Sequence, residues 1–351
     1  MPNPNELAPL TVIPGALRFN TDSMKLEYYR GGPVGFGTTT QTGEWVNLTT
    51  DSPDIQTGGA RGVFMFGSIT PGTSYVNNIE YLTISTTGNS IDFGDTTGTA
   101  RGYAASFSSN TRGIFAAGQN GGSNQNAIDY ITISSTGNGI SFGGLLELVR
   151  YTTGFSNSTR GLISGGSNPS STNTIQYVTI ASTGNTIDFG DTSGGTFTAG
   201  ASCASSTRGL IQRGSTTNIE FITISTLGNT ASFGNETVSR SNGMGASNAI
   251  RGIFAGGYVT PTTTNVIDYI TIATLGNAID FGDLTSGRNF GASMSSTIRG
   301  VFATGGSYPA GSNTIDYVTI MSTGNAIDFG DTSTGAPLGA AGCSNGHGGL
   351  G

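Results

Sequence analysis

Residues 297–331 read TIRGVFATGGSYPAGSNTIDYVTIMSTGNAIDFGD. An Arg-Gly pair starts a short apolar segment that stops at a Gly-Gly pair, and a polar loop leads to the segment IDYVTI. The turn STGN is followed by a third segment, AIDFG. Short apolar segments bounded by Gly, Ser and Asn are typical of β-strands. We therefore expect three strands in this stretch.

The same module occurs six times along the chain. Its Arg-Gly pairs begin at Arg61, Arg112, Arg160, Arg208, Arg251 and Arg299, separated by 51, 48, 48, 43 and 48 residues. The aromatic residue of the middle strand is Tyr81, Tyr130, Tyr177, Phe221, Tyr269 and Tyr317. The Phe-Gly pair of the last strand begins at Phe93, Phe142, Phe189, Phe233, Phe281 and Phe329. A fixed period of this length indicates one structural unit that is copied and stacked.

A further segment rich in Gly, Ser and Ala lies between modules, for example RGYAASFSS and RNFGASMSS. Small side chains suit a strand crowded near an axis, so we expect four strands per repeat. Four short strands per repeat are typical of a β-propeller. The Arg, the apolar strand ending in Gly-Gly and the Asp-Tyr strand resemble kelch repeats. The prediction is an all-β chain with a six-bladed kelch-like β-propeller over residues 51–351.

Packing and closure follow from this fold. Blades stack face to face, so the first strand of each module should be buried on both faces. The first repeat lacks a Gly/Ala strand before Arg61, whereas the C-terminal segment PLGAAGCSNGHGG supplies an extra one. We therefore expect residues 337–345 to form the innermost strand of the first blade and to close the ring.

Residues 1–50 do not belong to the repeat. Segments 16–19, 25–29 and 44–48 predict a small antiparallel meander that contains Trp45, the single tryptophan. The stretches LRFNTDSMKLEYYRGG and GEWVNL resemble a short module common in bacteriophage tail fibres and other virion proteins, with a longer Gly/Thr-rich link here. This resemblance implies a meander that attaches the chain to other virion proteins or assembles it into a homo-oligomer such as a trimer.

Composition argues against several classes of partner. The net charge is −7 and Lys25 is the single lysine, which argues against nucleic-acid binding. No apolar run reaches the ~20 residues of a membrane helix, so we expect no membrane insertion. The N-terminus lacks the basic start and apolar core of a secretory signal. Two cysteines make no disulfide framework.

Groups suited to catalysis are scarce. His347 is the single histidine and lies in the Gly-rich tail. No nucleophile elbow, phosphate loop or metal-ligand spacing is present. Carboxylates recur as DFGD in four of the six repeats, so capping of turns is favoured over calcium binding or catalysis. We expect no enzymatic activity and no cofactor.

The six Arg-Gly arginines recur in every repeat. A guanidinium carries a fork of donors, so we expect these side chains to hold neighbouring blades together through carboxylates and carbonyls. Anion binding in the central channel is the alternative.

The loops between the first two strands of each module vary most in sequence, and they lie on the same face as the linkers between blades. Loops on a rigid scaffold are common binding sites, and aromatic rings there could stack on sugars. The candidate ligand-binding residues on these loops and linkers are Tyr75, Arg150, Tyr151, Tyr258, Arg288, Phe290 and Tyr308. The alternative is that the loops vary in length without functional constraint and that their tyrosines have no role in binding.

The resemblance of the meander to virion modules, joined to a Gly/Thr-rich and nearly Lys-free repeat domain, implies a non-enzymatic structural protein of a phage virion. We expect it to be assembled in the host cytoplasm as part of a tail fibre, a tail tip or a capsid decoration. The propeller would be exposed for host recognition or decoration. A lectin-like module for a host-surface glycan is the second hypothesis, and a polysaccharide depolymerase is less favoured.

Overall fold

The computed structural model describes residues 16–20, 25–31, 43–47, 60–65, 67–70 and 74–350. The chain forms two compact units, Met1–Ile55 and Gln56–Gly351.

The first unit contains one antiparallel sheet, the meander that the sequence predicts. Its order is β1 (Leu17–Asn20), β2 (Lys25–Gly31) and β3 (Gly43–Asn47). The Trp45 ring packs edge-on against Tyr29, with the centroids 5.4 Å apart. The Arg18 guanidinium lies 4.2 Å from the Trp45 ring and donates a 2.8 Å hydrogen bond to Glu27.

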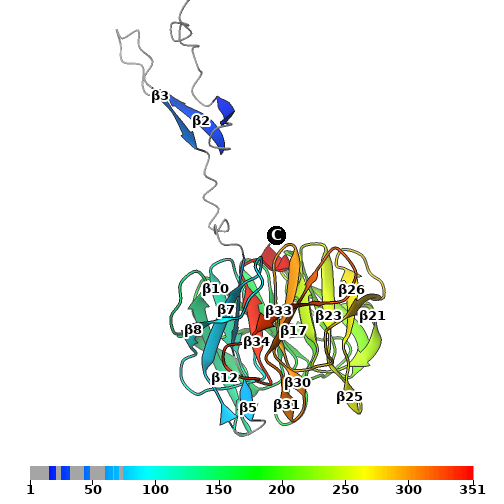
Figure 1. Ribbon diagram of the computed structural model, residues 1–351. Coiled ribbons are helices and arrows are strands. Elements are labelled where there is room, and N and C mark those ends of the chain that lie inside the picture. Colours follow the sequence, from blue (N-terminus) through cyan, green and yellow to red (C-terminus); the bar gives the residue numbers. More distant parts are fainter. Residues whose placement is uncertain are drawn as a thin grey trace, which may run out of the picture. The chain divides into compact units, whose positions relative to one another are not determined.

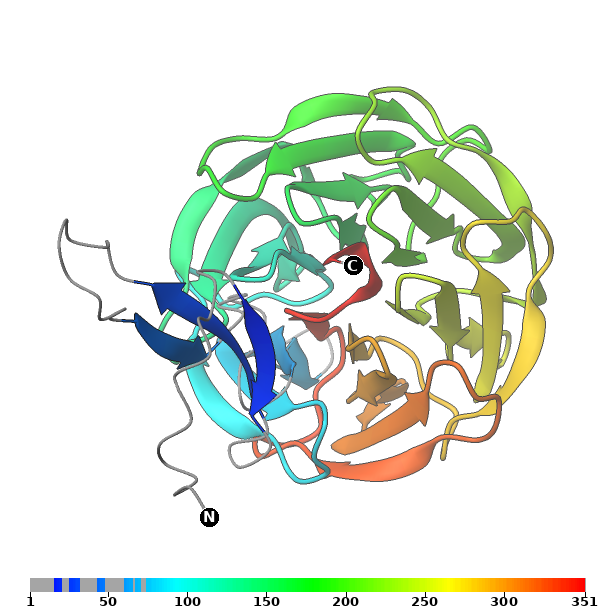
Figure 2. The same ribbon diagram turned by 90° about the horizontal axis from the view of Figure 1, so that it is seen from above.

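The second unit is a six-bladed β-propeller of four-stranded antiparallel sheets, as predicted (Figure 2). Blade 1 contains β34 (Ala341–Ser344), β4 (Arg61–Met65), β7 (Asn78–Thr83) and β8 (Ile91–Asp95). Blade 2 contains β9 (Ala105–Ser108), β10 (Arg112–Ala116), β12 (Ser123–Thr132) and β13 (Ile140–Val149). Blade 3 contains β14 (Thr153–Ser156), β15 (Arg160–Ser164), β16 (Thr174–Thr179) and β17 (Ile187–Asp191).

The other three blades repeat this order from the axis outward. Blade 4 contains β18 (Ala201–Ala204), β19 (Arg208–Gln212), β20 (Thr216–Thr223) and β21 (Ala231–Arg240). Blade 5 contains β22 (Met244–Ser247), β23 (Arg251–Ala255), β26 (Val266–Thr271) and β27 (Ile279–Asp283). Blade 6 contains β28 (Ala292–Ser295), β29 (Arg299–Ala303), β32 (Thr314–Thr319) and β33 (Ile327–Asp331).

The C-terminal strand closes the ring. Strand β34 pairs with β4, with Ala341 opposite Met65 and Ser344 opposite Gly62. Blade 1 is therefore built from both ends of the propeller sequence, which confirms the predicted closure. This pairing leaves no free inner edge on the first blade.

Short strands extend the loops on one face of the propeller. They are β5 (Ser68–Thr70), β6 (Ser74–Tyr75), β11 (Gln119–Asn120), β24 (Tyr258–Val259), β25 (Thr262–Thr263), β30 (Gly306–Ser307) and β31 (Ala310–Gly311). We call this the loop face, and it is the lower edge in Figure 1. The 3-10 helix η2 (Gly348–Leu350) and the C-terminus lie at the opposite face.

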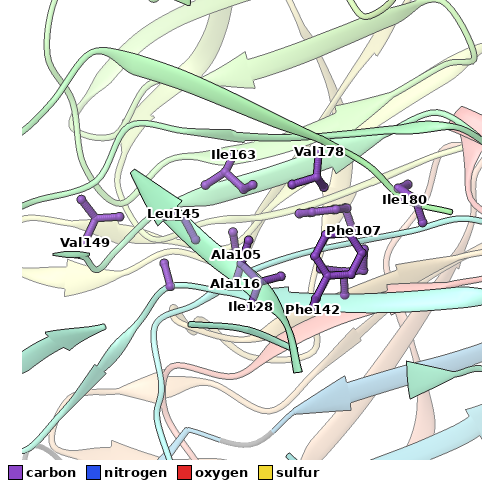
Figure 3. Close-up of a cluster of buried hydrophobic side chains, with 12 residues drawn as sticks. Ala105, Phe107, Ala116, Ile128, Phe142, Leu145, Val149, Ile163, Val178 and Ile180 are labelled. Atoms are coloured by element: carbon purple, nitrogen blue, oxygen red, sulfur yellow. The ribbon is translucent and has the colours of Figure 1, made fainter. Parts of the chain in front are cut away.

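Apolar side chains fill each junction between blades. The second strand of every blade is buried along almost its whole length, as expected for sheets covered on both faces. Figure 3 shows one such junction, where Phe107 and Phe142 of blade 2 meet Ile163 and Val178 of blade 3. Equivalent clusters lie at the other five junctions.

The STGN turns join the blades at the rim. In each blade a bulge turns the Phe of the outer strand into the core, edge-on to the aromatic residue of the third strand, with centroids 5.7–6.3 Å apart. The carbonyl of this Phe accepts a 2.8–3.1 Å hydrogen bond from the turn glycine of the next blade. The glycine after the Phe is needed for this approach, because a Cβ on Gly234 would overlap the Gly276 carbonyl oxygen.

We predict that Gly234→Ala lowers the free energy of unfolding by about 1–3 kcal/mol, the usual cost of forcing an atom into a packed site. Gly144→Ala is the matched control on another outer strand, because its Cβ would lie 3.5 Å from Asn126 in ordinary contact. Urea unfolding of both variants checks this, and equal stability of the two would contradict the close approach.

Candidate functional site

Six linker residues form a ring at the mouth of the central channel on the loop face. Each lies two residues before an innermost strand and has a left-handed backbone, with φ between 57° and 76°. The six are Tyr103, Tyr151, Ala199, Asn242, Phe290 and Gly339. Each N–H donates to the carbonyl of the ring residue in the preceding blade at 2.6–3.0 Å, and the six bonds close on themselves. The backbone therefore fixes six Cα positions around the axis.

Three aromatic side chains of this ring meet over the mouth. The centroid of Tyr103 lies 4.9 Å from that of Tyr151 and 4.9 Å from that of Phe290. Gly339 makes room for them, because a Cβ there would lie 2.7 Å from the Tyr103 ring. Contacts of this kind hold aromatic rings in fixed orientations.

Loop residues add polar groups beside these rings. Tyr75 packs against Gly102, and its hydroxyl accepts a 2.7 Å hydrogen bond from Gln119 Nε2. Gln119 Oε1 in turn accepts a hydrogen bond from Arg150 Nη1, and the Arg150 guanidinium lies 5.1 Å from the Tyr151 ring. We call the group Tyr75, Tyr103, Gln119, Arg150, Tyr151, Phe290 and Tyr308 the mouth patch.

The phenols of Tyr103 and Tyr151 stay protonated at neutral pH, so each keeps an O–H group. Burial, followed by the nearby phenols of Tyr151, Tyr75 and Tyr308, raises the pKa of Tyr103 far above its ordinary value. Burial also raises the pKa of Tyr151, against the opposing effect of Arg150. Tyr308 is 67% exposed and presents its ring to solvent.

The structure brings together five of the seven residues that the sequence proposes for ligand binding. These five are Tyr75, Arg150, Tyr151, Phe290 and Tyr308. Tyr258 lies on β24 in blade 5, where its backbone pairs with Ser241. Sequence reasoning missed Tyr103 and Gln119. Tyr103 could have been found by aligning the linkers, because it stands where Tyr151 and Phe290 stand.

The assignment of Arg288 to ligand binding is wrong. Its side chain is fully buried and forms a 2.9 Å ion pair with Asp316. It also donates a 3.0 Å hydrogen bond to the Phe302 carbonyl. Burial lowers its pKa, and Asp316 opposes that effect. Arg288 therefore holds blade 6 together and is closed to a ligand.

The Arg-Gly arginines form a second closed cycle. Each donates through Nη1 to an Ile carbonyl of the next blade at 2.7–3.1 Å, and Arg299 returns to blade 1. Each guanidinium also lies 4.1–4.6 Å from the centroid of the aromatic ring of its own third strand. These guanidinium groups therefore join neighbouring blades, as the sequence predicts. Their hydrogen-bond acceptors are main-chain carbonyls, and the carboxylates that the sequence also suggested are not their partners.

The DFGD carboxylates do not cap turns. Within the described part of the chain, the side chains of these repeated aspartates accept no hydrogen bond, and Asp92 and Asp328 are exposed. The turn asparagine instead joins neighbouring blades, as in the 3.1 Å bond from the Asp95 amide on β8 to Asn138 Oδ1 of blade 2.

The channel behind the patch has a cavity of about 150 Å³ lined by all six innermost strands. Serine hydroxyls of these strands donate to carbonyls of the neighbouring strand at 2.6–2.8 Å, so they join strands. His347 lies toward the other face and donates from Nε2 to the Ser108 carbonyl at 3.0 Å. Burial lowers the pKa of His347 to about 4, so the imidazole is neutral at pH 7.

The described residues include no cluster of three or more His, Cys, Asp or Glu side chains suited to a metal ion. No helix in the described ranges is long and apolar enough to cross a membrane. Cys203 and Cys343 are buried and free, and burial raises the pKa of both thiols.

Comparison with protein-family models and with curated protein sequences finds no match to this chain.

We predict that Arg288→Met lowers the free energy of unfolding by about 3–5 kcal/mol, because it leaves the buried Asp316 carboxylate without its partner. Arg150→Met is the matched control and should cost about 1 kcal/mol, because its hydrogen bond goes to a neutral amide. Urea unfolding measures both. Adding Asp316→Asn to Arg288→Met should recover part of the loss, and similar effects of the two single changes would contradict the assignment.

Proposed function

We propose that this chain is a non-enzymatic recognition protein of a bacteriophage particle, and that its mouth patch binds a glycan of the host surface. The observation that carries the proposal is the patch itself. Four tyrosines and one phenylalanine lie together with an amide and a guanidinium at one end of a rigid ring.

Such a surface suits a sugar. The apolar faces of pyranose rings stack on aromatic side chains, while hydroxyl groups need donors and acceptors placed beside the rings. Tyr151 and Tyr308 offer aromatic surface, and the buried Gln119 holds the Tyr75 hydroxyl and the Arg150 guanidinium in place by hydrogen bonds on both sides. The closed backbone ring holds these groups before a ligand arrives, which limits the entropy lost on binding.

The patch favours binding over hydrolysis. Glycoside hydrolysis generally uses a pair of carboxylic acids that flank the scissile bond. None of the seven patch residues carries a carboxylate. A lectin-like role is therefore supported better than a depolymerase.

The virion part of the proposal rests on the N-terminal unit. Its sequence resembles the tail-fibre module, and its three strands form the meander that the resemblance implies. A three-stranded sheet of this size buries little surface by itself, so it favours docking on other virion proteins or on further copies of the chain. Location in a tail fibre, a tail tip or a capsid decoration fits this arrangement equally.

We predict that Tyr151→Ala and Tyr308→Ala each weaken glycan binding by roughly tenfold, the effect of removing an aromatic anchor worth about 1–2 kcal/mol. Tyr258→Ala is the control, because it removes a loop tyrosine of blade 5 outside the patch. Glycan-array and titration measurements on host-surface sugars check this. Binding that is absent in the parent, or unchanged in both patch variants, would contradict the proposal.

We predict that amine-reactive cross-linking at Lys25, the single lysine on β2, joins this chain to another virion protein or to a second copy in intact particles. Mass spectrometry of purified particles identifies the partner, and a species of three linked chains would indicate a trimer. Lys25→Arg is the control for reaction at the N-terminal amine. Particles that contain no copy of the chain would refute the virion assignment.

A further inference from the structure

Three linker arginines, each two residues before a ring residue, are neutralised by a carboxylate on the third strand of the blade that follows the linker. Arg101 pairs with Asp129 at 2.8 Å, and Arg288 pairs with Asp316 at 2.9 Å. Arg240 pairs with Asp268 and with Glu236. These side chains are almost completely buried. A buried guanidinium needs such a partner, because removing its charge from water is costly.

The acidic partner is a fixed position of the repeat, directly before the third-strand aromatic residue. The residues there are Glu80, Asp129, Gln176, Glu220, Asp268 and Asp316. Blade 3 is the exception, with a neutral amide in place of a carboxylate. Gln176 Oε1 accepts hydrogen bonds from the Leu146 amide at 2.9 Å and the Thr186 hydroxyl at 2.6 Å. The Gln176 side chain therefore binds residues on and beside the outer strands of blades 2 and 3, and it has no negative charge that could form an ion pair with an arginine.

Arg150 stands one residue before its ring residue, whereas Arg101, Arg240 and Arg288 stand two residues before theirs, so the equivalent position in blade 3 is the buried Val149. No ion pair joins Arg150 to a carboxylate in the described part of the chain. Its guanidinium turns toward the mouth patch and donates from Nη1 to Gln119. Its Nε is buried and donates no hydrogen bond to any described residue. The side chain is half-buried and lies close enough to the phenols of Tyr103 and Tyr151 to affect their ionisation.

The groups around Arg150 match an anion. The guanidinium presents a flat fork of donors that fits a carboxylate or phosphate, and protonated phenols beside it add O–H donors. The protein as a whole carries a net charge of −7, so its overall field does not attract anions. The attraction is therefore local to Arg150 and depends on contact.

We propose that the mouth patch recognises an acidic sugar, whose carboxylate or phosphate binds Arg150 while its ring stacks on the neighbouring aromatic side chains. This inference rests on the proposed function, glycan binding at the patch, and adds the chemical class of the sugar. It follows from the place of Arg150 one residue nearer the ring, at the mouth patch, in a blade where Val149 and Gln176 stand in place of the buried arginine and carboxylate.

Matched sugars with and without charge test this on the full-length protein. The pairs are trigalacturonate and its methyl ester, sialyllactose and its methyl ester, and mannose 6-phosphate and mannose. The parent should bind the acidic member of at least one pair roughly ten- to one-hundredfold more tightly, the range expected for a hydrogen-bonded charge pair. The phosphate pair separates phosphate from carboxylate recognition. The preference should shrink as salt rises, because ions screen a partly exposed pair.

Arg150→Gln should abolish the preference for the acidic sugar, because it removes the charge and keeps an amide donor. Arg150→Lys should retain part of the preference, since it keeps the charge without the fork. Arg18→Gln makes the same change in net charge in the N-terminal unit and should have no effect.

The outcomes separate this inference from the proposed function. Equal binding of charged and uncharged sugars by the parent, with loss of both on Tyr151→Ala, overturns the acidic-sugar inference and leaves glycan binding intact. A preference that survives Arg150→Gln also overturns it. Failure of every sugar to bind overturns both. The Arg150 ¹⁵Nε resonance gives a direct check, because it should shift on titration with galacturonate and remain unmoved by galactose if the inference holds.

Discussion

The propeller depends on hydrogen bonds that run in closed cycles from blade to blade. Near the axis, six linker amides each donate to the carbonyl of the preceding blade. At the rim, six turn glycines each donate to the outer-strand Phe of the preceding blade, and six arginines cross the junctions between them. Every blade is both donor and acceptor in each cycle. Buried backbone groups need such partners, so a missing blade would leave groups unpaired on both of its neighbours.

This closure is also what creates the candidate site. Tyr103, Tyr151 and Phe290 come from the linkers of blades 2, 3 and 6, yet their rings meet within 6 Å. The shared left-handed backbone aims all three at the mouth, and Gly339 leaves the space that the Tyr103 ring fills. Rigid closure therefore turns residues that are distant in sequence into one surface, without any motion of the loops.

The fold could be predicted because the repeat makes each local pattern visible six times. The period, the Gly/Ala strand and the extra C-terminal segment were enough for the number of blades and for closure. The site could be predicted in part, because loop aromatics are visible in the sequence but their convergence is not. Arg288 stands two residues before its ring residue and Arg150 stands one residue before, and only the first position reaches the carboxylate of the third strand. A single linker does not reveal this difference, because the ring residue that sets the alignment varies in type from blade to blade.

The axial ring uses only main-chain atoms, and this has a consequence for how such a protein can change. Because the ring makes no demand on side-chain hydrogen bonding, its six positions carry Tyr, Tyr, Ala, Asn, Phe and Gly on one unchanged backbone. Substitutions at these positions can alter what the mouth presents while the folding interactions stay the same. The backbone conformation is thus the same in all six blades, whereas the side chain that each blade presents at the mouth differs. Selection for a new ligand could therefore change these side chains one blade at a time.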